Sequence, residues 1–160
     1  MGADRHNQGL PNPNLWSHGL SFRTDPLAIL LEMAAPEGRQ TSTAEAALAA
    51  AALVATAASD VSFAERSMVG EAIAAMAEHG FTPMDHAAAR FDDHVNAIRA
   101  NSSQGRKSAL AQAAALGPNA GAGADVVLRI AHAIAIADGD IEAAERDSLD
   151  EIAAALGREI

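Results

Sequence analysis

The abundance of alanine constrains the fold of this chain more than any other feature of its sequence. Alanine occupies 41 of the 160 positions, whereas the aromatic residues are one tryptophan and four phenylalanines. Alanine is the strongest helix former, and a shortage of aromatic side chains disfavours a β sandwich. Because alanine also lets helix axes approach at the close end of the range of about 8–10 Å, we expect a compact all-α bundle.

The charge balance of the chain excludes several classes of partner. It carries 21 acidic and 11 basic residues, a net charge of −10 that repels nucleic acid and anionic lipid. The absence of cysteine excludes disulfides and thiolate metal sites. The alanine-rich stretch Ala46 to Ala58 has 13 residues, fewer than the roughly 20 that span a bilayer. Residues 1–5 do not resemble a secretory signal, so we expect a cytoplasmic protein with no direct membrane span and no nucleic-acid partner.

Helix start and stop signals divide the chain into an N-terminal arm, residues 1–24, and a helical domain, residues 25–160. The arm is rich in Gly, Pro, Asn and Ser, which do not sustain a helix, and it carries Trp16, Leu20 and Phe22. These apolar side chains would dock either on the domain or on a second subunit. In the domain, capping residues, prolines and glycines predict seven helices, near residues 26–35, 42–58, 62–78, 82–100, 102–116, 124–137 and 142–156.

Capping patterns set the starts of the second and third predicted helices. Ser42 is followed three residues later by Glu45, and Ser62 is followed by Glu65 at the same spacing. In such a capping box the serine hydroxyl accepts a hydrogen bond from the backbone, and the glutamate carboxylate accepts one from the serine N–H. We therefore expect both glutamates to lie in the first turn of a helix.

The chain contains an internal repeat with an offset of 80 residues. Residues 48–76 align with residues 128–156 without a gap, with 11 identities in 29 pairs, of which six are alanine pairs. Four of the remaining matches join charged residues, which chance explains poorly: Asp60 with Asp140, Glu65 with Glu145, Arg66 with Arg146 and Glu71 with Glu151. The repeat predicts two related helical hairpins with a tight acidic turn in each, and with the fourth and fifth helices between them.

The second acidic turn resembles a known family. Residues 137–141 read Ala-Asp-Gly-Asp-Ile, and Glu145, Leu149, Ile152 and a closing Leu156-Gly157 follow. This pattern is similar to the signature of the TerB family of tellurite-resistance proteins, whose relatives include the N-terminal module of a membrane-anchored J-domain cochaperone. The resemblance covers about residues 25–157. It implies an all-α domain of two pseudo-symmetric halves, a metal-binding role for the acidic residues and an association with stress responses.

The acidic residues of the two turns are the candidate metal ligands. The second copy offers four carboxylates and the first copy retains two: Asp138, Asp140, Glu142 and Glu145, then Asp60 and Glu65. Ca²⁺ or Mg²⁺ takes six or more oxygen ligands, so turn carbonyls and water would have to supply the rest. Gly139 directly follows the first aspartate, which is not the spacing of an EF-hand. So few protein ligands predict weak binding, on the order of 10⁻⁴ M or weaker.

Helix capping is the competing explanation for the same carboxylates. Glu65 and Glu145 are each placed to accept a hydrogen bond from a backbone N–H at the start of a helix. The helix dipole also favours carboxylates in a first turn, by about 0.3–1 kcal/mol each. The sequence leaves both explanations open.

The histidines do not form a recognisable catalytic set. His86 and His94 share a predicted helix, but their separation of eight residues turns the rings about 80° apart around its axis. We expect both at the surface, and we expect His132, which lies among apolar residues, to be partly buried. No nucleophile and base are placed together by spacing, so we do not expect an enzyme.

These patterns together predict a non-enzymatic module. The resemblance implies a stress-response protein of the tellurite-resistance type, with a protein partner in the same stress system. The acidic turn adds weak binding of a divalent cation, Ca²⁺ or Mg²⁺. The alternative is a metal-free interaction scaffold or homodimer that uses the Trp16 arm and the alanine-rich helix faces.

Overall fold

The computed structural model describes residues 26–58 and 60–159 of the chain. The predicted arm, residues 1–24, and the predicted helix cap at Asp25 lie outside the described residues. The described part forms helices and turns and contains no strand, which confirms the expected all-α bundle. It contains seven α-helices and the short 3-10 helix η1 (Ala35–Glu37): α2 (Pro26–Ala34), α3 (Gln40–Ala55), α4 (Phe63–Glu78), α5 (Met84–Ala100), α6 (Ser102–Ala114), α7 (Ala122–Ala135) and α8 (Ala143–Ala155).

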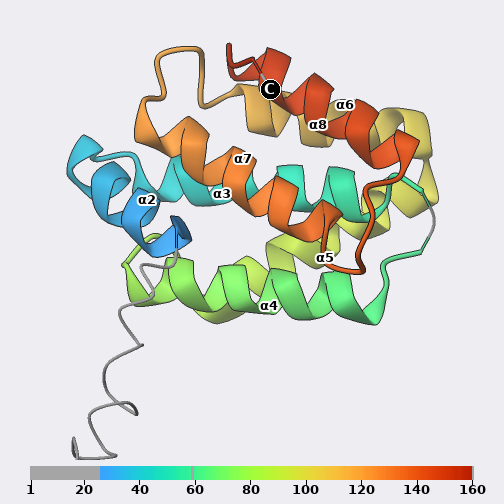
Figure 1. Ribbon diagram of the computed structural model, residues 1–160, viewed down its shortest axis with the longest axis horizontal. Helices are drawn as coiled ribbons and strands as arrows, with labels where there is room; N and C mark the ends of the chain where they lie inside the picture. Colours follow the sequence, from blue (N-terminus) through green and yellow to red (C-terminus); the bar gives the residue numbers. More distant parts are fainter. Residues whose placement is uncertain (1–25, 59, 160) are drawn as a thin grey trace, which may run out of the picture.

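Helix α3 is the centre of the bundle. Every residue from Thr43 to Ala55 except Glu45 is buried, and α3 packs against α5, α6, α7 and α8 (Figure 1). A helix that is surrounded on every side needs no polar face, which explains its run of alanine and leucine. At Gly123 of α7 an added Cβ would lie 2.8 Å from Thr43 Oγ1, so glycine permits the close crossing of α3 and α7. No helix in the described ranges is long and apolar enough to cross a membrane.

The helices on either side of the two acidic turns end and begin at equivalent positions of the repeat. α3 ends at Ala55 and α7 ends 80 residues later at Ala135, while α4 begins at Phe63 and α8 begins 80 residues later at Ala143. α4 packs against α7 as well as α3, and α8 packs against α3 as well as α7. The helix boundaries agree with the sequence repeat, whereas the pseudo-symmetry of the two hairpins stays a prediction.

The predicted N-terminal caps of two helices are wrong. α3 begins at Gln40, so Ser42 lies inside the helix and forms no capping box with Glu45. The Glu45 side chain instead contacts α5, because α5 lies against this part of α3. The sequence predicts Ser102 or Ser103 as the cap of α6, but the cap is Asn101, whose side chain accepts a hydrogen bond from Gln104 N. Asn and Ser are about equally good N-caps, and Asn101 is the residue with the extended backbone just before the helix.

A residue distant in sequence caps the start of α7. Glu37 Oε1, in η1, accepts a hydrogen bond from Ala122 N at a distance of 2.9 Å. Arg158 donates from Nη2 to the carbonyl of Gly121, the preceding residue, at 2.8 Å. These contacts satisfy backbone groups that the helix itself leaves unpaired, and they tie both ends of the described chain to one helix terminus.

Candidate functional site

The second acidic turn joins α7 to α8. Gly139 adopts a positive φ of 123° with open space where a Cβ would lie, so the turn requires glycine for its backbone conformation and not for packing. Asp138, Asp140 and Glu142 are exposed, whereas Glu145 is buried, with 4% of its surface exposed. Glu145 Oε2 accepts a hydrogen bond from the Glu142 N–H at 2.7 Å. The carboxylate therefore satisfies a backbone donor at the start of α8.

The first acidic turn joins α3 to α4 and retains part of this arrangement. Glu65 is buried, and its Oε2 accepts a hydrogen bond from the Ser62 N–H at 2.6 Å. The Glu65 N–H donates in return to Ser62 Oγ at 3.1 Å, which confirms the capping box predicted for this helix. Asp60 is exposed, and its Oδ1 lies 3.2 Å from Arg99 Nη2 of α5. One predicted ligand of the first copy is thus in an ion pair, and the other is a helix cap.

The charge of Glu65 reaches Glu145, although the two glutamates belong to different turns. The pKa of Glu145 is raised above its usual value, first because burial disfavours the charged carboxylate. The nearby negative charges of Glu65, Asp138 and Glu142 raise it further, against the opposing effect of the hydrogen bond from the Glu142 backbone. Since Glu65 belongs to the other turn, the packing brings together the equivalent glutamates of the two sequence copies.

Neither of these glutamates has a cationic side chain as a partner. Within residues 26–58 and 60–159, Glu65 and Glu145 form no ion pair with lysine, arginine or histidine. Their favourable contacts in this part of the chain are backbone N–H groups at two helix N-termini. A buried carboxylate without a counter-charge is costly, and the raised pKa of Glu145 reflects that cost.

The candidate ligands do not form a preformed metal cage. In the described part of the chain, no group of three or more histidine, aspartate or glutamate side chains is arranged to hold a metal ion. Asp60 is paired with Arg99, and the Oε2 atoms of Glu65 and Glu145 already accept backbone hydrogen bonds. An ion bound here would have to take most of its ligands from water and backbone carbonyls.

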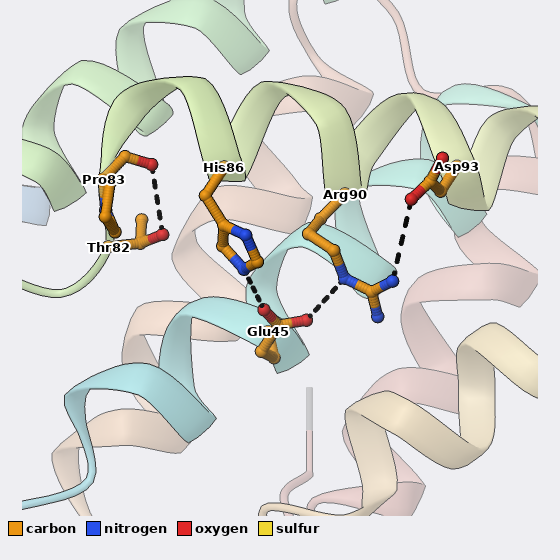
Figure 2. Close-up of polar contacts among 6 residues, drawn as sticks. All are labelled: Glu45, Thr82, Pro83, His86, Arg90 and Asp93. Atoms are coloured by element: carbon orange, nitrogen blue, oxygen red, sulfur yellow. Dashed lines mark hydrogen bonds and ion pairs between the residues drawn. The ribbon is translucent and has the colours of Figure 1, made fainter.

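A second charged cluster, which sequence patterns did not reveal, joins α3 to α5. Glu45 Oε1 lies 2.9 Å from His86 Nε2, and Glu45 Oε2 accepts a hydrogen bond from Arg90 Nε at 3.0 Å. Figure 2 shows His86 and Arg90, one helical turn apart on α5, reaching the same carboxylate. Arg90 Nη1 also lies 3.7 Å from Asp93 Oδ2. The one available signal was that Glu45 is the single charged residue of α3.

The electrostatics of this cluster differ from those of the acidic turns. Burial raises the pKa of Glu45, but the hydrogen bonds from His86 and Arg90 outweigh that effect. The pKa of Glu45 therefore lies below its usual value. The cluster is an ion-paired bridge between two helices.

The other histidines depart from the sequence-based expectations. His94 is half-buried rather than exposed, and its Nε2 atom has no hydrogen-bond partner in the described chain. Burial lowers the pKa of His94, and the positive charge of Arg90 lowers it further. His132 is exposed rather than partly buried, because α7 buries its other faces against α2, α3 and α8.

Comparison with known proteins identifies no relative of this chain. No protein-family model, no curated protein and no solved structure matches it. Its function is therefore inferred from its own residues and their geometry.

Proposed function

We propose that this chain is a non-enzymatic, TerB-like stress-response module that binds a divalent cation weakly where its two acidic turns meet. The observation that supports this proposal is the pairing of two buried glutamates, Glu65 and Glu145, without a cationic side chain among the described residues. A divalent cation would supply the missing positive charge, and Ca²⁺ and Mg²⁺ both prefer carboxylate oxygens. The negative charge of Asp138 adds to the attraction for a cation.

The hydrogen bonds of the two glutamates favour weak binding. Because each Oε2 accepts a backbone N–H, one oxygen of each carboxylate is available to an ion. Water and backbone carbonyls would complete the coordination, and we expect an affinity no tighter than on the order of 10⁻⁴ M. An ion held there would connect the N-termini of α4 and α8, so its main effect would be to stabilise the fold on which a protein partner docks.

Thermal unfolding of chelator-treated protein with added Ca²⁺, Mg²⁺ or Mn²⁺ tests the cation site. An ion present at 100 times its Kd should stabilise the fold by about 2.7 kcal/mol. For a chain of this length, that energy raises Tm by roughly 5–10 °C. A flat titration of the wild-type protein would contradict the proposal and leave helix capping as the role of both glutamates.

A double variant assigns the effect to the paired glutamates. Glu65→Gln with Glu145→Gln keeps an oxygen acceptor for each backbone N–H but removes both charges, so it should lose the rise in Tm. The matched control, Glu32→Gln with Glu78→Gln, removes two exposed carboxylates elsewhere and should respond like the wild type. An equal loss in both double variants would show that the ion responds to net charge and not to this site.

A metal-free interaction scaffold or homodimer is the second candidate. Phe63, the first residue of α4, is 88% exposed beside the first acidic turn. Exposed aromatic side chains are enriched at protein interfaces. If Phe63 mediates self-association, the mass of the Phe63→Ser variant in solution should be lower than that of the wild type. The mass of the control Met84→Ser should equal that of the wild type, and chelation should change none of these masses. Sedimentation of the three proteins with and without EDTA distinguishes this candidate from the cation-binding module.

A further inference from the structure

An apolar groove lies between α2, α4 and α7. Its volume is about 470 Å³, within the range of roughly 300–1,000 Å³ that is typical of ligand-binding pockets. Its lining is mostly apolar, with Glu71 and Arg129 as its charged members, and its larger apolar side chains are Leu27, Met68, Ile130 and Ile136. The groove is separate from the two buried glutamates, which do not line it.

Helix α2, which forms one wall of the groove, is apolar on more than one side. Leu31 and Ala34 are buried in the core, yet Ile29 is 41% exposed and Met33 is 59% exposed. An isolated helix of nine residues is marginal in water, so α2 depends on contacts with the rest of the chain. Leu27 is the residue of α2 that lines the groove, whereas Ile29 and Met33 lie on another side of the helix.

The segment that precedes α2 has the composition and the attachment to cover this groove. Trp16, Leu20 and Phe22 lie in residues 1–25, outside the described part of the chain. Leu27, the second residue of α2, lines the groove, so the segment is attached at its edge. At about 3.5 Å per residue, Phe22 lies within roughly 14 Å of Pro26 along the chain, and Trp16 within roughly 35 Å.

We propose that the segment from Trp16 to Phe22 occupies the groove between α2, α4 and α7 of the same molecule, with the indole of Trp16 against the apolar lining. A short tether gives such a segment an effective concentration in the millimolar range, so binding within one molecule outcompetes binding to a second copy in dilute solution. A buried tryptophan removes about 150–250 Å² from water, which is the driving force for this contact. The proposal goes beyond the cation site and does not depend on it.

Fluorescence of the full chain in EDTA tests the proposal, because Trp16 is its only tryptophan. In the native protein we expect emission at short wavelength and quenching by acrylamide several-fold weaker than in urea. Ile136→Glu places a charge in the groove at a position that is 42% exposed, and it should give the emission and quenching of a solvent-exposed indole. The control Met84→Glu changes an exposed residue outside the groove and should leave both unchanged.

The fold of each variant is checked by its far-UV circular dichroism and cooperative unfolding. Should Ile136→Glu fail to fold, Met68→Gln on the opposite wall provides the same test. A solvent-exposed indole in the wild type would overturn the proposal, and so would a shielded indole that neither groove variant releases. If dilution exposed the indole and lowered the mass of the protein in solution, the segment would be bound to a second copy. That result would also overturn the proposal.

Discussion

Glu45 and Glu145 are two glutamates held near the core under opposite electrostatic conditions. The Glu45 side chain is 18% exposed and is bound by His86 and Arg90, so its pKa is lowered despite burial. Glu145 is buried, its hydrogen bond comes from the backbone, and its charged neighbours are acidic, so its pKa is raised. Burial raises the pKa of both carboxylates, and the hydrogen bonds and charges of His86 and Arg90 reverse that effect at Glu45.

The contrast also separates a structural role from a binding role. Glu45 has its counter-charges within the protein and joins α3 to α5 as a bridge. Glu145 has no cationic side chain beside it among the described residues and is the place where we propose that an external cation binds. Substitutions at the two places therefore test whether they differ as the structure indicates.

Removal of the arginine from the bridge should have the largest effect. Arg90→Met keeps an apolar stem but leaves Glu45 with His86 alone. Because hydrogen bonds to charged groups contribute about 1.5–3 kcal/mol and Arg90 is partly exposed, we expect a loss near the lower figure in urea unfolding. The control Arg66→Met breaks an exposed pair with Asp92 at 3.8 Å and should cost less than about 1 kcal/mol. Equal losses would mean that the bridge resembles any surface pair.

Substitution of each glutamate by glutamine should reveal opposite pH dependences. The raised pKa of Glu145 means that the folded state binds its proton more tightly, so the free energy of unfolding falls as pH rises from 4.5 through the folded pKa. The lowered pKa of Glu45 means that stability falls as pH drops from 4.5 through the folded pKa. Glu145→Gln should remove the first trend and Glu45→Gln the second.

Urea unfolding of these variants and the wild type, from about pH 3 to pH 8, measures both trends. Glutamine at position 145 can still accept the hydrogen bond from the Glu142 N–H, so the capping role is retained. If both variants changed the pH profile in the same direction, the contrast between the two sites would be wrong.

The smallest effect is expected at His94, near the bridge. An NMR titration of its ring should give a pKa below 6.5, because burial and the charge of Arg90 both disfavour the protonated form. The folded protein should therefore lose stability as pH falls from 6.5 through this pKa. In Arg90→Met the pKa of His94 should move upward, and no movement would assign the shift to burial alone.

Local sequence patterns predicted much of the fold and the capping contacts of the candidate site. Helix propensity and capping residues indicated the seven helices and a capping role for Glu65 and Glu145, because these effects act within one or two helical turns. The same spacing at Ser42 and Glu45 led to a wrong helix start. The spacing of a capping box cannot distinguish a residue at a helix terminus from one that a neighbouring helix binds.

Alanine content and short-range capping were enough to predict a helical bundle with two acidic turns, because both act without any knowledge of distant residues. The packing of the helices was needed to show that the charge of Glu65 reaches Glu145, that His86 and Arg90 reach Glu45, and that Glu37 caps α7. The hydrogen bonds from His86, Arg90 and Ala122 join residues that are 41 to 85 positions apart in the sequence. Counter-charges and caps of this kind depend on how helices pack, and packing is a property of the whole chain.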